Sequence, residues 1–189
     1  MRDSFASLVR LFVCLSVGVV ATSCSSTVTN RDPIGEPFPE VVGTSLDGEE
    51  LTLPADLGPG PKVLLVGYLM DAQFDLDRWI LGLVQLETPA RIVEVPTIRG
   101  MLPGLFAGRI DDGMRSGIPN EDWSSVVTVY RADASRIVEM TGNQKGRNAR
   151  VLLVDDAGVV RWFHDRGYSA GHLQALDDAV RALPAGVDR

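Results

Sequence analysis

Apolar and polar residues follow two different periods along this chain, and together they predict an α/β domain. Residues 62–70 form a continuous apolar run, which is typical of a strand buried on both faces. Residues 75–86 carry apolar side chains at positions i, i+3, i+4, i+7 and i+8, which is the stripe of an amphipathic helix. Similar patterns predict further strands at 91–98, 125–130, 150–155 and 159–164, and further helices at 102–116, 133–140 and 169–183.

Turn and cap residues separate these segments. Asp47-Gly48 lies between alternating apolar residues and predicts a hairpin over residues 46–53, and the Asp-Ala-Gly turn at residues 156–158 predicts a second hairpin. Either Asp71 or Asp75 is expected to cap the helix at 75–86. The resulting order, β-α-β-α-β-α-β-β-α, predicts a parallel core sheet with one antiparallel hairpin edge and helices on both faces.

The N-terminus has the pattern of an export signal. Arg2 and Arg10 precede an apolar stretch, residues 11–20, that is too short to span a bilayer, which takes about 20 residues. Residues 21–24 (Ala-Thr-Ser-Cys) resemble the lipobox of bacterial lipoproteins, although its first position is more often Leu than Ala. The resemblance implies that residues 1–23 are a cleaved signal peptide and that Cys24 receives a diacylglycerol. Residues 24–37 are then expected to form a flexible tether, and residues 38–189 the domain.

The composition of the chain excludes several classes of function. The chain has 189 residues, and its two cysteines, Cys14 and Cys24, both lie in the first 24. Disulfides, thiolate catalysis and cysteine-ligated zinc are therefore excluded from the globular part. The formal net charge of −7 argues against nucleic-acid binding, which needs a positive surface.

Four motifs in their order resemble the thioredoxin-like superfamily, in particular its peroxiredoxin-type branch. They are the Phe-Pro pair at 38–39, the hairpin at 46–53, the strand at 63–71 and the closing hairpin at 152–160. The resemblance implies a central mixed sheet flanked by helices. A weaker similarity covers about 30 residues, from the Leu-Val-Asp turn at 153–155 through residues 160–162 and Gly167 to the final helix. Over this stretch the chain resembles the thioredoxin-like assembly factors of mitochondrial ATP synthase, which also lack the usual cysteine pair.

The chain departs from this superfamily at the residues that carry its chemistry. Redox members place a nucleophilic cysteine at the start of the first helix, where the helix dipole stabilises a thiolate. By register Leu76 stands near that position in this chain. Redox members also carry a cis-proline before the third core strand, whereas Asn148-Ala149 stand there in this chain. These departures therefore predict a domain without thiol chemistry.

Few other residues suggest a site. No catalytic residue, metal site or cofactor is predicted. His164 and His172 are expected to be two surface histidines, with a close approach of the two as the less favoured alternative. The three aspartates at 71, 75 and 77 lack the spacing of an EF-hand loop. A binding patch is expected at the entry to the first helix and on the helix at 102–116, formed by Gln73, Asp75, Asp77, Arg78 and Arg115.

Two hypotheses follow. The first is a membrane-tethered, redox-inactive binding or assembly module of the cell envelope, anchored by lipid on Cys24 and acting on a protein partner. In a host with two membranes, Ser25 after the cysteine indicates the periplasmic face of the outer membrane. The alternative is a carboxylate- or metal-dependent envelope enzyme of unknown substrate.

Overall fold

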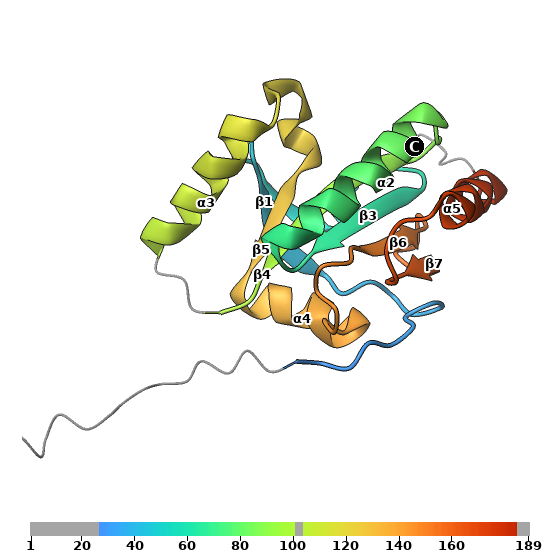
Figure 1. The fold of residues 1–189 in the computed structure, drawn as a ribbon, viewed down its shortest axis with the longest axis horizontal. Helices are drawn as coiled ribbons and strands as arrows, with labels where there is room; N and C mark the ends of the chain where they lie inside the picture. The colour runs from blue at the N-terminus through green and yellow to red at the C-terminus, as the bar shows by residue number, and fades with distance from the viewer. Residues whose placement is uncertain (1–26, 101–103, 185–189) are drawn as a thin grey trace, which may run out of the picture.

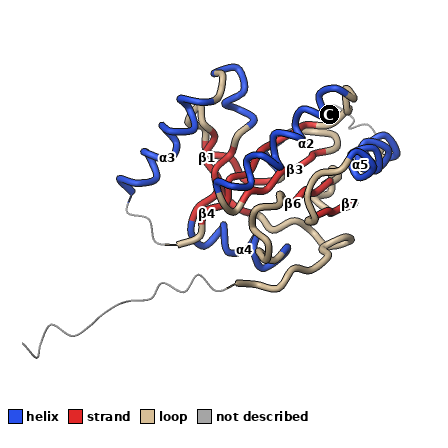
Figure 2. Tube along the Cα trace, in the orientation of Figure 1, coloured by secondary structure: helices blue, strands red, loops and turns tan. Residues whose placement is uncertain are grey.

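A single mixed sheet organises the domain (Figures 1 and 2). The computed structural model describes residues 27–100 and 104–184. In this part of the chain, seven strands lie in the order β2-β1-β5-β4-β3-β6-β7. Their bounds are β1 Val41–Ser45, β2 Glu50–Leu53, β3 Lys62–Gly67, β4 Arg91–Ile98, β5 Val127–Tyr130, β6 Arg150–Val154 and β7 Val160–His164.

The centre of the sheet is parallel and both edges are antiparallel. β3 pairs parallel with β4, and β4 pairs parallel with β5. β6 joins β3 antiparallel and continues into β7. The first hairpin, β1 and β2, also joins the sheet, because β1 pairs antiparallel with β5. The prediction of a single antiparallel hairpin edge is therefore wrong, although both hairpins form where the turn residues predict them.

Helices cover both faces of the sheet. α2 (Gln73–Gln85) and α5 (Ala170–Ala182) pack on one face, and α4 (Arg131–Thr141) packs on the other. α3 (Gly104–Gly117) stands at the left of Figure 1, beside β1. The apolar stripe predicted for α2 is buried at Leu76, Trp79 and Leu83, whereas Val84 points to solvent.

The helix ends follow the local sequence. α4 stops before Gly142, whose φ of +72° lies in the left-handed region that favours glycine. The Ser169 side chain accepts a hydrogen bond from the backbone N–H of His172 and so caps α5, as predicted. The predicted aspartate cap of α2 is wrong. A 3-10 turn (η2, Met70–Ala72) leads into the helix, and no side chain caps it.

Part of the segment predicted as a tether lies against the domain. The backbone N–H of Val28 donates to Asn143 Oδ1, and the N–H of Asn143 donates back to the Val28 carbonyl. Pro37 forms a bridge with Val159. Within the described residues, hydrogen bonds to the domain are thus already present at Val28, ahead of the boundary predicted at Phe38. The predicted signal peptide and Cys24 lie outside the described residues, and none of the helices in the described part has the length and apolarity to cross a membrane.

Candidate functional site

Asp75 occupies the place where the resemblance puts redox chemistry, at the start of α2. Its carboxylate is buried and accepts two backbone N–H donors, from Ala149 at 2.9 Å and from Tyr168 at 2.7 Å. Ala149 lies just before β6, and Tyr168 just before α5. One side chain therefore connects three segments that are distant in sequence. The neighbouring Leu76, the residue predicted to replace the cysteine, is buried in the core beneath α2.

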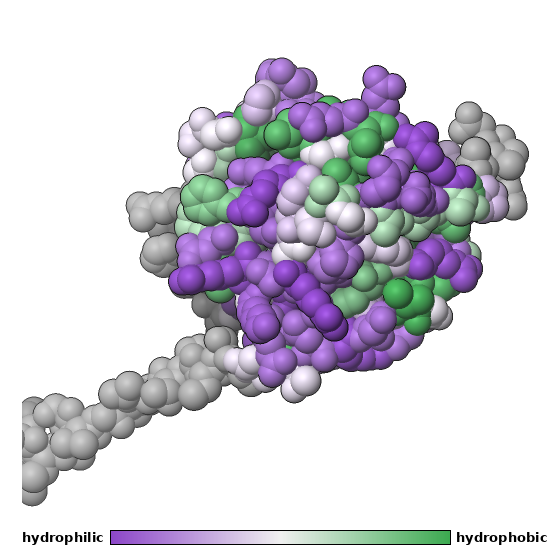
Figure 3. Space-filling model, turned by 45° about the vertical axis from the view of Figure 1, so that its right-hand side comes forward, coloured by the Kyte–Doolittle hydropathy of each residue, from purple (hydrophilic) through white to green (hydrophobic). Residues whose placement is uncertain are grey.

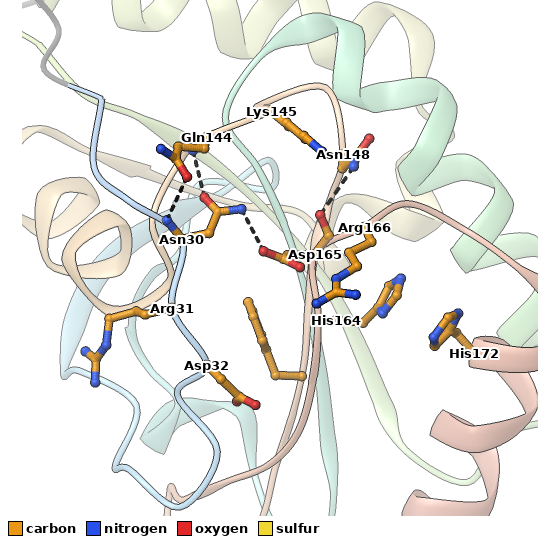
Figure 4. A pocket seen from close by; sticks show the side chains of 11 residues that line it. Asn30, Arg31, Asp32, Gln144, Lys145, Asn148, His164, Asp165, Arg166 and His172 are labelled. Carbon is orange, nitrogen blue, oxygen red and sulfur yellow. Dashed lines mark hydrogen bonds between the residues drawn. The ribbon is translucent and has the colours of Figure 1, made fainter.

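A polar cavity of about 730 Å³ opens beside this connection (Figure 4). Four segments form its wall: residues 30–32, the loop before β6, the end of β7 and the first turn of α5. Its lining combines amides, cations, carboxylates and imidazoles, from Asn30, Arg31, Asp32, Gln144, Lys145, Asn148, Phe163, His164, Asp165, Arg166 and His172.

Asn30 ties the N-terminal segment to the floor of this cavity. Its Nδ2 donates to Asp165 Oδ2 at 2.6 Å, and its Oδ1 accepts from the Gln144 N–H at 2.8 Å and from Arg150 Nη2 at 3.1 Å. Arg150 is completely buried, and its guanidinium donates hydrogen bonds to neutral oxygens, with the charge of Asp165 nearby. The network makes the segment predicted as a tether part of the candidate site.

His164 and His172 form a stacked pair at one side of the cavity. Their ring centroids are 3.9 Å apart with 31° between the planes. His164 Nε2 lies 2.8 Å from the Gly167 carbonyl, and His172 Nδ1 lies 2.7 Å from Ser169 Oγ. Burial lowers the pKa of His164, and the charge of His172 lowers it further. The prediction of two surface histidines is therefore wrong for His164, which is buried, whereas His172 is exposed as predicted. The two rings approach each other, as the alternative prediction had it.

The aspartates considered for a cation do not converge. Asp71 pairs with Arg147 at 3.1 Å, Asp75 accepts backbone donors, and Asp77 accepts from Gln73. Over the described residues as a whole, no group of three or more His, Cys, Asp or Glu side chains could hold a metal ion.

The predicted binding residues separate into three environments. Gln73 and Asp77 are exposed and joined at 2.8 Å, and Arg78 follows them on α2. Asp75 is buried instead, and its carboxylate accepts hydrogen bonds from the backbone N–H groups of Ala149 and Tyr168. Arg115 lies in the last turn of α3, which ends well away from the start of α2 (Figure 1), and donates to the Leu46 carbonyl at 2.7 Å. These five residues do not form one patch.

Glu94 is a candidate that the sequence prediction missed. It lies on β4, facing α2, and is buried. Its pKa is raised to about 7, mainly by burial. A hydrogen bond from Gln73 lowers the pKa, and the nearby charge of Asp77 raises it. A signal was present, because Glu94 interrupts the apolar strand between Val93 and Val95, where a charge has no solvated face to occupy.

The comparisons with known proteins place the fold. The sequence matches no protein-family profile and no curated protein. Solved structures do match. BsSco, a member of the Sco family of cytochrome c oxidase assembly proteins, has a TM-score of 0.53 and 12% identity over 82% of this chain and 99% of its own. A putative electron transfer protein from Aquifex aeolicus VF5 has a TM-score of 0.52 and 13% identity, over 78% and 92% of the two chains.

A thiol peroxidase from Chromobacterium violaceum is similar to the same extent, with a TM-score of 0.51 and 11% identity over 82% of this chain and 90% of its own. At these identities the likeness concerns the fold alone. It agrees with the mixed sheet and its flanking helices, as the sequence motifs predict. The fold of this chain is thioredoxin-like.

Proposed function

We propose that this chain is a lipid-anchored, redox-inactive thioredoxin-like domain that serves as a binding or assembly module in the cell envelope. The observation that carries the proposal is Asp75. A redox member would present a thiol at the start of α2, whereas this chain uses a buried carboxylate there to hold the loops before β6 and α5. Its two cysteines precede residue 25, so the domain has no thiol of its own.

The cavity beside Asp75 supports a binding role. Its lining includes three cations, Arg31, Lys145 and Arg166, of which Arg31 pairs with Glu36, beside the carboxylates of Asp32 and Asp165. Such a mixture suits a polar partner segment that carries both charges, because each charge of the partner finds an opposite one on the rim. BsSco, with the same fold, belongs to a family of assembly proteins, which is consistent with an assembly role for this chain. The exposed Gln73, Asp77 and Arg78 remain a proposed second contact surface.

Site-specific photo-crosslinking in native membranes tests this proposal. A photoreactive residue in place of Arg166, on the cavity, is expected to give a discrete adduct. The same residue in place of Gln174, exposed on α5, is the matched control and is expected to give none. The purified protein is expected to reduce neither peroxide nor disulfides. Turnover of either substrate, or equal crosslinking at both positions, would contradict the proposal.

A carboxylate-dependent enzyme is the second candidate, and Glu94 is the observation that favours it. A carboxyl group with a pKa of about 7 can donate or accept a proton near neutral pH, as general acid–base catalysis requires. Under this alternative, any hydrolytic activity of the purified chain disappears in Glu94→Gln and persists in Asp71→Asn, whose carboxylate is exposed. An activity that survives Glu94→Gln would exclude Glu94 as the catalytic acid or base.

A further inference from the structure

Three large apolar side chains are exposed together at the start of α2. Met70 is 94% exposed, Phe74 75% and Leu69 55%. Met70 and Phe74 are four residues apart across the turn that enters the helix, a spacing that puts side chains on one helical face. Exposed apolar clusters on an otherwise polar protein mark contact surfaces. Hydrophilic residues dominate the face of this molecule drawn in Figure 3.

This apolar cluster lies next to the point where the chain enters the domain. Val28 is hydrogen-bonded to Asn143, at the start of the loop before β6. Three residues further along that loop, a Cβ on Gly146 would lie 3.1 Å from Leu69 Cδ1, so the loop touches the cluster. The loop therefore has the incoming chain on one side and the cluster on the other.

The covalent link between the predicted lipid and the domain is short. From Cys24 to Val28 the chain advances four residues, which span at most about 14 Å when fully extended. A lipid on Cys24 would therefore hold Val28, and with it the loop before β6, close to the headgroups. The polar interface of one leaflet is itself roughly 5–7 Å thick. The cluster is then within reach of the bilayer surface.

Exposed cations occur in the segments that carry or touch the cluster. Lys145 and Arg147 project from the loop, and Arg78 follows Phe74 by one helical turn. Asp71, inside the cluster, pairs with Arg147, so these two charges offset each other and Lys145 and Arg78 supply the positive charge. Apolar side chains flanked by Lys and Arg are the composition of surfaces that lie in the membrane interface, where the cations meet lipid phosphates. On a chain with a net charge of −7, such a surface favours one orientation toward a phospholipid bilayer.

We infer that Leu69, Met70 and Phe74, with Lys145 and Arg78, form a membrane-contacting surface that sits in the headgroup region of the bilayer carrying the lipid anchor. The inference rests on the lipid anchor of the proposed function. It adds the orientation of the domain, since the cavity and its stacked histidines then open beside the membrane instead of facing away from it.

Fluorescence quenching in vesicles tests this surface with the full, processed chain. Because Cys14 lies in the predicted leader and Cys24 would be acylated, a cysteine introduced by Met70→Cys is the single free thiol and can carry a polarity-sensitive dye. Val84→Cys is the matched control, because Val84 is 61% exposed and lies near the other end of the same helix. In phosphatidylcholine–phosphatidylglycerol vesicles, headgroup spin labels are expected to quench the dye at residue 70 several-fold more strongly than the dye at residue 84.

Flotation of the same vesicles tests the lipid anchor separately from the membrane-contacting surface. Flotation of the wild-type chain with lipid, together with loss of flotation in Cys24→Ser, would support the lipid anchor. If the dyes at residues 70 and 84 are then quenched equally, the proposed membrane-contacting surface is wrong. If the wild-type chain fails to float, the anchor fails and the surface with it. A dye at residue 70 that is shielded from water in native membranes but not in pure lipid vesicles would also overturn the inference, in favour of a protein partner.

Discussion

The carboxylate of Asp75 accepts a hydrogen bond from the backbone N–H of Ala149, 2.9 Å away and 74 residues further along the chain. The contact joins the first turn of α2 to the residue before β6. A second donor, the Tyr168 N–H, approaches the other carboxylate oxygen. The bond to Ala149 is buried and the bond to Tyr168 is partly buried, so this side chain holds both segments at the place where the resemblance expected a reactive group.

Asp75→Ala is therefore expected to destabilise the domain strongly. The substitution leaves two backbone N–H groups without their acceptor, and one of them, at Ala149, is buried. The expected loss in the free energy of unfolding is about 2–4 kcal/mol. Asp71→Ala removes an exposed ion pair and should cost no more than about 1 kcal/mol. Equilibrium unfolding in urea measures both, and equal losses for the two variants would contradict this role of Asp75.

Because the pKa of Glu94 is raised, we expect the free energy of unfolding to fall as the pH rises. Its pKa is raised to about 7 in the folded state, from 4.5, so the folded state binds its proton more tightly than the unfolded state does. The free energy of unfolding should therefore decrease between about pH 4.5 and pH 7, by about 3 kcal/mol at most at about 1.36 kcal/mol per pKa unit. Glu94→Gln should be more stable than the wild type at pH 8 and show a flatter profile. An unchanged pH slope in Glu94→Gln would argue against a raised pKa.

Because the pKa of His164 is lowered, we expect its contribution to the free energy of unfolding to rise with pH, opposite to that of Glu94. Its pKa is lowered in the folded state by burial, so the unfolded state binds the proton more tightly. Stability should be retained above the unfolded pKa of about 6.5 and lost as the pH falls below it. His172→Phe keeps a ring in the stack and removes its charge, so it should raise the pKa of His164. Nuclear magnetic resonance titration of the imidazole proton gives the answer directly, and a pKa that stays the same or falls would be inconsistent with the pair.

Gly142→Ala is expected to loosen the N-terminal segment from the domain. At Gly142, where φ is +72°, a Cβ would lie 2.4 Å from the Asn30 Cα and from the Thr29 carbonyl oxygen, so the backbone must move. We expect a loss of about 2 kcal/mol or more and faster tryptic cleavage after Arg31. Gly171→Ala is the control, because a Cβ there meets nothing within 4 Å and alanine favours the helix. Equal proteolysis of the two variants would show that Gly142 does not hold this segment.

Local patterns in the sequence were sufficient to predict the elements and their order, but not that both edges of the sheet are antiparallel. Hydrophobic period distinguishes strand from helix over a few residues, so the order of the elements, the hairpins at Asp47-Gly48 and residues 156–158, and the Ser169 cap could all be predicted. That order, together with its turns, resembles the thioredoxin-like superfamily, and the solved structures show the same fold. Each of these features depends on residues that are close together in the chain, and the structure confirms them.

The candidate site depended on tertiary structure. A pattern shows that Asp75 and Glu94 are charged, but whether each is capped, solvated or buried depends on partners such as Ala149 and Tyr168, which the sheet brings close only after folding. The stack of His164 on His172 and the attachment of Val28 to Asn143 arise in the same way. The sequence by itself determined the elements and the absence of a thiol after Cys24. Long-range packing alone decided which polar groups meet, because the energy of a buried hydrogen bond or charge is set by its neighbours in space.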